Sequence, residues 1–521
     1  MTWTLSRIRY SRHPRSRRRP DGESGREAER RREVIDKVIG SPAEAVSDVG
    51  PGSVIGIGGF GVIHGFPVHL ITAVRDRGLS DLVLVCNSLG TQPGHPLTLV
   101  EQGQARKLVV SFSARAGGVV SSAQAISPVP LEIELVPQGI LVERLRSAGA
   151  GLGPFYSPVG QDTILAAGKE CREFDGRRHV LEEPLRLDFA LIYAHTADRA
   201  GNLAFRGVNQ NFGPSFAKAA RVVIAEVDEI VAAGELGPDD IDLPGIFVDR
   251  VVRSPVPRTP RWPESRPRDE RRHYLGRPGL TPRELGARIA ALLPEHSYVN
   301  LGVGLPTHVS DHLLDRDIVL HAENGLLGYS ARIAVAEADE DIYNAASEPV
   351  SLRKGAAAFD TVAAFEMARG GRLDAVVLGA YQVAGDGSFA NWTTPEMGGG
   401  AIGGAMDLVV RPGKLIIAMR HAERSGRPKI VRACQYPVTG TCCVDLIVTD
   451  VAVIERDERG LVLRECAAGF TADDVQELTE PPLVVELWAD QADPAAAGYR
   501  GWREAFRSGR PAGRTAPCLA R

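Results

Sequence analysis

The residues with the clearest potential for chemistry lie in the stretch 317–325, whose sequence is DIVLHAENG. Its apolar, β-branched run predicts a buried strand, and the Asn-Gly pair at its end predicts a turn. Glu323 would then lie at the carboxyl end of a strand, where open α/β sheets bind their ligands. Because no basic residue adjoins it, its carboxylate could act as a nucleophile, a general base or a metal ligand. The alternative from this stretch alone is a surface acid that precedes a turn.

Two glycine-rich segments could bring the backbone close to a ligand. The first, 56–61 (GIGGFG), follows a predicted strand and matches the GxGxxG dinucleotide fingerprint. That fingerprint requires an acid about 20 residues further on, but the next predicted strand ends in Cys86-Asn87-Ser88, so nicotinamide binding is not favoured. The second, 398–404 (GGGAIGG), can present several backbone N–H donors. We predict a strand at 408–410 directly after it, which favours an ordered loop at a sheet end over a flexible surface loop.

The two halves of the chain repeat one pattern. The segment 53–69, SVIGIGGFG followed by GFPVH, corresponds to YVNLGVGLPTH at 298–308. Each is a predicted strand, a glycine turn and a proline at a helix start, where the missing N–H costs nothing. A second pair follows, with FALIYA and AGNLAF in 189–205 matching DAVVLGA and AGDGSFA in 374–390. We therefore predict two related modules with a site in the cleft that they share.

The expected fold class is α/β, with two open modules joined by a linker. The predicted strands are nearly continuous runs of Val, Ile and Leu, as in sheets with both faces covered. The segment 253–280 is rich in Pro and Arg and can continue neither a helix nor a central strand. Strands are expected at 82–86, 107–111, 221–226, 415–418 and 446–448, and an amphipathic helix at 281–293. The expected boundaries are a disordered Arg-rich extension at 1–38, a first module at 39–252, the linker at 253–280, a second module at 281–490 and a C-terminal tail at 491–521.

The composition argues against several classes of protein. At 521 residues the chain is too long for one core, and its net charge of −4 argues against a nucleic-acid binder. The first 33 residues carry eleven arginines and five acids, unlike an acid-poor transit peptide. We interpret them as a disordered extension or an over-long gene start, with a nucleic-acid arm as the alternative. No apolar run reaches 18 residues, so no membrane span is expected. The seven cysteines include no CxxC pair, so we expect no zinc site and reduced thiols in a cytoplasmic protein.

Longer motifs in both halves resemble a known family. AENGLLG (322–328), NLGVGLP (300–306), LGAYQVAGDGSFANW (378–392) and GGAMDLVV (403–410) resemble the β part of family I CoA-transferases. GGFG (58–61), PQGILVERLRSAGAG (137–151), FYSPVG (155–160) and DRAGNLAF (198–205) resemble the α part. The resemblance extends from about residue 41 to 485 and is nearest to succinyl-CoA:3-oxoacid and 3-oxoadipate CoA-transferases. It implies two fused modules with the NagB/RpiA/CoA-transferase type of α/β fold.

The resemblance also implies an activity and a set of site residues. Family members move CoA from an acyl-CoA to a carboxylic acid by ping-pong chemistry, through a CoA thioester on the glutamate that corresponds to Glu323. Their oxyanion donors correspond to the Gln138 side chain and the backbone N–H of Gly404. The residues expected to bind CoA or substrate are Gly58, Gly59, Asn324, Gly325, Gly403 and Ala405. No cofactor or metal is implied, because the CoA thioester is a substrate, and a homodimer or higher homo-oligomer is expected.

Two departures from the family pattern leave the substrate pair open. Where the family usually has two lysines, this chain has Met397 and Gly400, and the segment 114–129 lacks the usual Gly-Glu-Asn. The lost positive charge could weaken recognition of a dicarboxylate acyl group such as succinyl. Hydrolysis of acyl-CoA on the same scaffold and non-catalytic binding of acyl-CoA are the alternatives. The presence of both Glu323 and Gln138 argues against the second.

Overall fold

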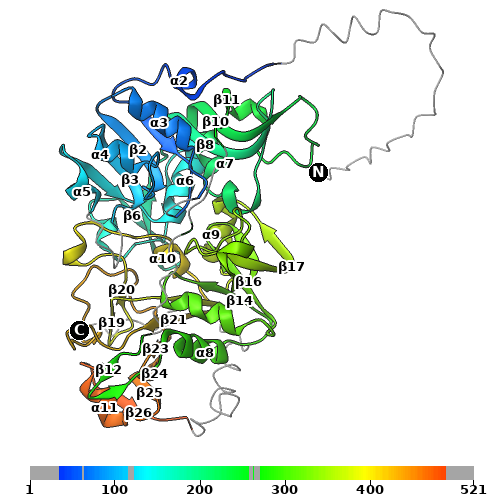
Figure 1. The fold of residues 1–521 in the computed structure, drawn as a ribbon. Helices are drawn as coiled ribbons and strands as arrows, with labels where there is room; N and C mark the ends of the chain where they lie inside the picture. Colours follow the sequence, from blue (N-terminus) through cyan, green and yellow to red (C-terminus); the bar gives the residue numbers. More distant parts are fainter. Residues whose placement is uncertain (1–34, 62–63, 115–121, 257–261, 263–269, 489–521) are drawn as a thin grey trace, which may run out of the picture.

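The computed structural model describes residues 35–61, 64–114, 122–256, 262 and 270–488. In these residues the chain forms two large sheets with helices packed against them, one sheet in each half (Figure 1). The first half, blue to green in the figure, lies against the second half, green to orange. The predicted α/β class with two related modules is confirmed. The module boundaries stay a prediction.

The first sheet has the strand order β11-β10-β8-β1-β2-β3-β4, and the short β9 pairs with β8. All neighbours along this path are parallel, as expected for apolar strands with both faces covered. The strands are β1 (Val54–Ile57), β2 (Leu82–Ser88), β3 (Ala105–Phe112), β4 (Glu132–Leu135), β8 (Leu187–Asp198), β9 (Leu203–Ala204), β10 (Ala220–Val231) and β11 (Arg250–Arg253).

The second sheet has the order β17-β16-β15-β14-β18-β21-β23-β24-β25-β26. The five strands from β15 to β23 are parallel, whereas the pairs β17-β16, β16-β15, β23-β24 and β24-β25 are antiparallel. The strands are β14 (Ser297–Leu301), β15 (Ile318–Ala322), β16 (Leu326–Arg332), β17 (Val350–Ala358), β18 (Ala375–Leu378), β21 (Lys414–Met419), β23 (Leu446–Thr449), β24 (Ala452–Asp457), β25 (Gly460–Cys466) and β26 (Leu483–Val485).

The two sheets share a five-strand parallel unit. β11-β10-β8-β1-β2 corresponds to β23-β21-β18-β14-β15. The first glycine after β1, Gly58, donates its N–H to Leu191 O at 2.9 Å, and the first glycine after β14, Gly302, donates to Val377 O at 2.8 Å. The predicted repeat is therefore confirmed down to the register of single hydrogen bonds.

The same register extends to the neighbouring strands, β2 and β15. The residue two before the glycine lies opposite Val85 in β2 and opposite His321 in β15. Two residues further along, the first module has Asn87 and the second has Glu323. Asn87 is therefore the structural counterpart of Glu323, although the sequence motifs around them differ.

Helices and smaller sheets complete the two modules. Helix α8 (Pro282–Leu292) begins as the sequence predicts, because Thr281 and Glu284 form a capping box and Pro282 stands at the first turn. The other helices are α2 (Pro42–Ala45), α3 (Val68–Asp76), α4 (Leu97–Glu101), α5 (Ala123–Ile126), α6 (Gln138–Gly149), α7 (Gly213–Ala219), α9 (Thr361–Arg369), α10 (Ala405–Leu408) and α11 (Ala472–Glu477). The smaller sheets pair β5 (Phe155–Ser157) and β6 (Cys171–Phe174) with β7 (Arg177–Glu182), β12 (His273–Tyr274) with β13 (Arg277–Pro278), and β20 (Phe389–Ala390) and β22 (Ile430–Val431) with β19 (Gln382–Ala384). The 3₁₀ turns are η1 (Ile164–Ala166), η2 (Gly207–Gln210), η3 (Gly245–Phe247), η4 (Leu305–His312), η5 (Val335–Glu337) and η6 (Pro395–Met397).

Some local expectations differ from the structure. The strand predicted at 408–410 is wrong, because Leu408 ends the short helix α10; a short apolar run fits a buried helical turn as well as a strand. The segment predicted as a linker contains β12 and β13, so its described end is structured. Most of the predicted N-terminal extension (1–34) and the predicted tail (491–521) lie outside the described residues. Cys442 is disulfide-bonded, so the prediction of reduced thiols is wrong there, whereas Cys86, Cys171, Cys434 and Cys466 are thiols.

Candidate active site

Glu323 follows β15 directly, at a turn that requires glycine. Gly325 has a φ of +104°, and a Cβ there would lie 1.9 Å from Phe359 O. Asn324 is buried, and its Nδ2 donates to Tyr343 O at 2.7 Å, which anchors the turn. The turn leads into the antiparallel strand β16, so the chain reverses beside Glu323 and leaves its carboxylate at the sheet end. The predicted position of Glu323 after a strand is confirmed.

A buried asparagine on the neighbouring strand contacts Glu323. Asn300, at the end of β14, donates its Nδ2 to Glu323 Oε2 at 3.3 Å and to His321 O at 3.2 Å. Burial raises the pKa of the Glu323 carboxyl above its usual range, while hydrogen bonds from its own backbone N–H and from Asn300 oppose the rise. Burial also lowers the pKa of His321 to about 4, so this imidazole is neutral and adds no charge beside the carboxylate.

Gln138 enters the same region from the first module. It begins helix α6 after Pro137, and its side chain is buried. Gln138 Nε2 donates to Asn87 Oδ1 at 2.9 Å, and Gln138 N donates to Gly403 O at 2.9 Å. Among the described residues, Gln138 Oε1 and Asn87 Nδ2 have no hydrogen-bond partner. The first module thus presents a buried pair of amides where the second presents a carboxylate.

The glycine-rich loop 398–404 joins the two modules. Ser113, just beyond β3, donates its backbone N–H to Gly400 O at 2.8 Å, and Phe112 forms an isolated β-bridge with Ala401. A Cβ at Gly400 would lie 2.7 Å from Leu135 and 2.8 Å from Trp392, so this backbone has no room for a lysine there. The loop is therefore ordered, as predicted, and its close packing accounts for the glycine at this position.

A charged cluster fixes α6 against the second module. Asp407 Oδ2 accepts from Gly139 N at 3.0 Å, and its Oδ1 accepts from Arg369 Nη1 at 3.1 Å. Arg369 Nη2 donates to Glu143 Oε1 at 2.5 Å. Burial raises the pKa of Asp407 to about 6, against the opposing effect of Arg369, so the carboxyl is ionised at neutral pH. Through these contacts the second module sets the position of the helix that carries Gln138.

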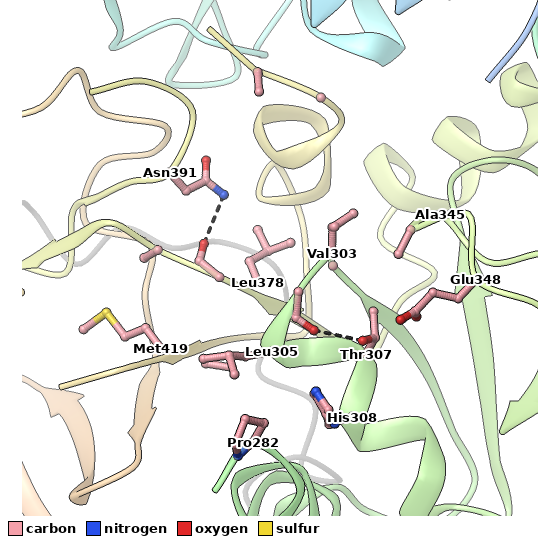
Figure 2. A pocket seen from close by; sticks show the side chains of 18 of the residues that line it. Pro282, Val303, Leu305, Thr307, His308, Ala345, Glu348, Leu378, Asn391 and Met419 are labelled. Atoms are coloured by element: carbon pink, nitrogen blue, oxygen red, sulfur yellow. Dashed lines mark hydrogen bonds between the residues drawn. The ribbon is translucent and has the colours of Figure 1, made fainter. Parts of the chain in front are cut away.

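One cavity of about 2960 Å³ lies between the modules and collects several predicted residues. Glu323, Gln138, Gly403, Gly404 and Ala405 all line it. A Cβ placed on Gly404 would lie 3.0 Å from Gln138 Oε1, so the amide and the glycine backbone are neighbours. Figure 2 shows the second module's contribution to the wall, which includes Val303, Leu305, Thr307, His308, Leu378, Asn391 and Met419.

Four residues predicted to bind substrate do not line the cavity. Gly58 lies against β8 through its N–H, and Gly59, with a φ of +129°, would place a Cβ 2.5 Å from Phe66. Asn324 and Gly325 shape the turn after β15, as described above. In the GGFG segment it is Phe60 and Gly61 that line the cavity. These glycines permit close packing rather than direct access to the cavity.

Some residues around the cavity were missed by the sequence reasoning. In the sequence, Asn300 belongs to the glycine motif of 298–304, and its signal is that a polar residue inside an apolar buried strand needs a polar contact. Asn87 gave no signal of its own and is recognised only from the strand register. Arg272 and Lys429 also line the cavity, from the predicted linker and from the segment after β21. In the described part of the chain, no cluster of three or more His, Cys, Asp or Glu could hold a metal ion, and no helix combines the length and apolarity needed to cross a membrane.

Comparisons with known proteins cover most of the chain. A family model described as coenzyme A transferase matches residues 39–254 and 283–478. The mouse protein named succinyl-CoA:3-ketoacid coenzyme A transferase 2B, mitochondrial, is 35% identical over 464 residues, which are 84% of this chain and 88% of its own. One 3-oxoadipate CoA-transferase polypeptide of Pseudomonas putida is 46% identical over 219 residues, which are 42% of this chain and 94% of its own. Among solved structures, an acyl-CoA transferase apoenzyme from Escherichia coli O157:H7 has a TM-score of 0.71 at 20% identity, and the match covers 89% of this chain and 98% of that one, which supports the fold.

Proposed function

The chain belongs to the coenzyme A transferase family and is a CoA-transferase, and on this premise we propose that it moves CoA between carboxylic acids through a thioester on Glu323. The observation that carries the proposal is the convergence of Glu323, Gln138 and Gly404 on one cavity. A carboxylate, an amide and a backbone N–H from two modules form the set that this acyl transfer requires.

The proposed reaction begins with attack by the Glu323 carboxylate on the thioester carbonyl of an acyl-CoA. The tetrahedral adduct expels CoA thiolate and leaves a mixed anhydride on Glu323. The thiolate then attacks the glutamyl carbonyl, which releases the first acid as a carboxylate and leaves a glutamyl-CoA thioester. A second carboxylate reverses these steps and departs as the new acyl-CoA, so turnover is ping-pong and the energy of the thioester is conserved.

In the proposed mechanism, the oxyanion of each tetrahedral adduct accepts hydrogen bonds from Gln138 and Gly404 N. The O and N positions of an amide side chain are assigned from its hydrogen bonds. If both amides of the Gln138–Asn87 pair are rotated by 180°, Asn87 Nδ2 donates to Gln138 Oε1 and the pair is kept. Gln138 Nε2 then takes the place of the unpartnered oxygen beside Gly404. Asn87 would therefore hold Gln138 in a donor orientation.

The raised pKa of Glu323 suits a nucleophile that is partly withdrawn from water. The carboxyl has few hydrogen bonds in the described structure, with Asn300 as its side-chain donor. A carboxylate with little solvation is a stronger nucleophile than a hydrated one. The same enclosure protects the anhydride from hydrolysis, so we infer transfer rather than acyl-CoA hydrolysis.

For the substrate pair, the relatives supply the candidates. The mouse relative is named for succinyl-CoA and 3-ketoacids, and the Pseudomonas putida relative for 3-oxoadipate. We propose a short acyl-CoA as donor and a 3-oxoacid as acceptor. Met397 and Gly400 remove two positive charges that the family pattern usually has, so we expect a monocarboxylate acyl group to be accepted at least as well as succinyl. A cytoplasmic location and a homo-oligomeric state stay expectations.

Trapping of the covalent intermediate tests the proposal. With acyl-CoA and no acceptor, part of the protein should gain the mass of CoA, and borohydride should then reduce the thioester to an alcohol and inactivate the enzyme. Peptide mass mapping should place the change on Glu323, and a Glu366→Gln variant, which alters an exposed acid outside the cavity, should behave as the parent does. Release of one free CoA for each acyl-CoA consumed, without any adduct, would instead identify a hydrolase. An adduct on another residue would contradict the role of Glu323.

A further inference from the structure

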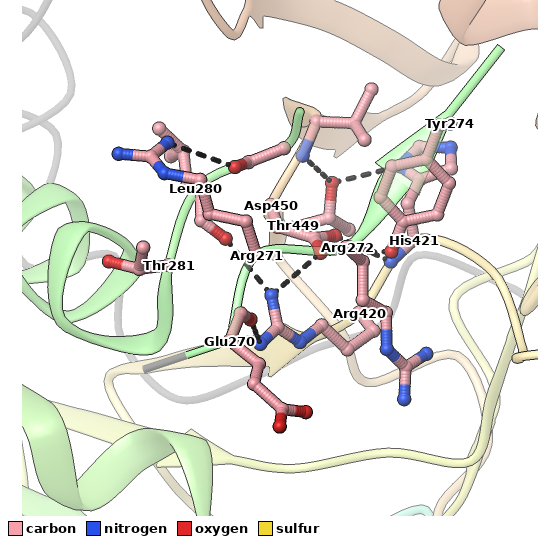
Figure 3. A network of polar contacts seen from close by, with 12 residues as sticks. Glu270, Arg271, Arg272, Tyr274, Leu280, Thr281, Arg420, His421, Thr449 and Asp450 are labelled. Atoms are coloured by element: carbon pink, nitrogen blue, oxygen red, sulfur yellow. Dashed lines mark hydrogen bonds and ion pairs between the residues drawn. The ribbon is translucent and has the colours of Figure 1, made fainter. Parts of the chain in front are cut away.

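The described end of the predicted linker forms part of the cavity wall. Residues 270–275 line the cavity together with residues from the segment after β21. Figure 3 shows this region, where Arg420 donates to Asp450 Oδ2 at 2.9 Å and to the backbone oxygens of Leu280 and Glu270. These bonds fix the linker end on the second module. The described end of the segment that the sequence presents as a spacer, 270–280, therefore has a defined position beside the substrate cavity.

Arg272 and Lys429 are cationic side chains on this wall that have no carboxylate partner among the described residues. Lys429 Nζ donates to Ala380 O at 2.7 Å, and Arg272 Nη1 donates to Ala422 O at 2.9 Å. Both side chains line the cavity, and within the described residues neither forms an ion pair. An ammonium has three donors and a guanidinium five, so both retain unused donors. In Figure 3 the Arg272 guanidinium extends away from the Arg420–Asp450 pair.

The neighbouring acids are already engaged by other groups. Asp450 accepts from Arg420, from the Tyr274 hydroxyl at 2.8 Å and from a backbone N–H. Glu423 pairs with Arg427 at 2.8 Å. Burial, reinforced by the charge of Arg272, lowers the pKa of Lys429 to about 8, while Asp450 and Glu423 only partly oppose this effect. Ala422, the residue that Arg272 contacts, forms an isolated β-bridge with Pro428, directly before Lys429. The two cations are therefore neighbours that repel each other in the absence of an anion, and a bound anion would relieve that repulsion.

We propose that Arg272 and Lys429 together bind a phosphate group of the CoA substrate, so that the linker supplies part of the CoA site. This inference rests on the proposed function, since CoA is the anion that a transferase of this type must hold. CoA carries a pyrophosphate and a 3′-phosphate at the end remote from its thiol. An arginine fork and a lysine ammonium are the side chains that bind phosphate most strongly. The thiol end must reach Glu323 in the same cavity, which leaves the nucleotide end for the outer wall.

The test compares two thioesters that carry the same acyl group, acyl-CoA and the acyl-pantetheine thioester without nucleotide phosphates. In the Lys429→Met and Arg272→Gln variants, the KM for acyl-CoA should rise about 10- to 100-fold, as for loss of a charged hydrogen bond. The KM for the pantetheine thioester, the KM for the carboxylate acceptor and the melting temperature should stay near parental values. Lys354→Met, which removes one exposed charge outside the cavity, is the matched control.

Calorimetric titration with CoA, dephospho-CoA and pantetheine separates the possible phosphates. If the pair binds the 3′-phosphate, the parent should lose affinity between CoA and dephospho-CoA, and the variants should not distinguish these two ligands. If it binds the pyrophosphate, that difference should appear between dephospho-CoA and pantetheine. Equal effects on both thioesters, or a selective rise in the KM for the acceptor, would overturn the proposal and assign the pair to the acid substrate. Parental protein that binds CoA but transfers nothing would contradict the proposed function without touching this inference.

Discussion

The carboxyl ends of β2 and β15 occupy equivalent places in the two sheets but hold different groups. Near the end of β2 the first module has Asn87, a neutral amide bonded to Gln138, and its sheet continues with parallel strands. After β15 the second module has Glu323, and the chain reverses at Gly325 into an antiparallel strand. Of these two corresponding residues, only Glu323 can form a covalent bond with an acyl carbon. The repeated scaffold thus supports two different tasks, attack and orientation, with one residue at equivalent positions deciding between them.

The largest loss of activity is expected when both strand ends carry an amide. Glu323→Gln keeps the shape of the side chain but removes the nucleophilic oxygen, so transfer should fall by about 10³-fold or more. Steady-state assays with matched acyl-CoA and acceptor concentrations would measure the loss, with Glu366→Gln as the control. Activity within about tenfold of the parent would show that the second strand end is not the reacting one.

Removal of the Gln138 side chain, which Asn87 contacts, tests how much the first module contributes to catalysis. Gln138→Ala should lower kcat and kcat/KM together by about 10²- to 10³-fold, as for the loss of an oxyanion donor. Alanine is a good helix former, so α6 should persist and the melting temperature should change little. A protein that is less stable yet fully active would reduce Gln138 to a packing residue and remove the first module from the chemistry.

A smaller effect is expected at Asn87, because this residue acts through Gln138. Asn87→Ala should lower kcat by about tenfold or less, the value of one hydrogen bond, with little change in KM. The double variant Asn87→Ala/Gln138→Ala should be no slower than Gln138→Ala alone. Additive losses in kcat would show that Asn87 does not act through Gln138. Asn87 would then have a separate role, and the assignment of orientation to the first strand end would be wrong.

The smallest expected effect concerns stability and pH. Folding raises the pKa of Glu323, so the ionised carboxylate destabilises the folded state at pH values above that raised pKa. Glu323→Gln should therefore have a higher free energy of unfolding than the parent at pH 8. The gap should shrink as pH falls through the raised pKa and vanish below the ordinary glutamate value of 4.5, where both side chains are neutral. Denaturant titrations of both proteins across this pH range would measure the difference in their free energies of unfolding. A difference that is constant or has the opposite sign would show that the carboxyl is not desolvated.

The chemistry of the second strand end could be predicted from the sequence because its signals are local. An acid after a β-branched run, followed by Asn-Gly, defines strand, position and turn within nine residues. The partner at the first strand end could not be predicted in this way. In the sequence, Asn87 is a neutral polar residue after an apolar run, which also suits an ordinary turn. Its importance depends on a hydrogen bond from Gln138, which is 51 residues away in the chain.

Local signals also failed where backbone packing decides the structure. The run 408–410 could form a strand or a helical turn, and the close approach of Gly403 and Gly404 to the first module selects the helix α10. For the predicted linker, the sequence provided only its composition. Composition indicates that a segment has little regular structure, but it does not indicate where its arginines lie. Contacts such as the one between Arg420 and Asp450 fix that position, and they join residues far apart in the sequence.

The hydrogen bond from Gln138 to Gly403 joins parts of a single polypeptide, and this has a consequence for how the enzyme responds to dilution. The two modules are present at a high effective concentration relative to each other, because the covalent connection makes their meeting unimolecular. Assembly of this pair within one chain therefore does not depend on the amount of protein present. Halves produced as separate polypeptides would have to find each other by diffusion, and their specific activity would fall as the solution is diluted.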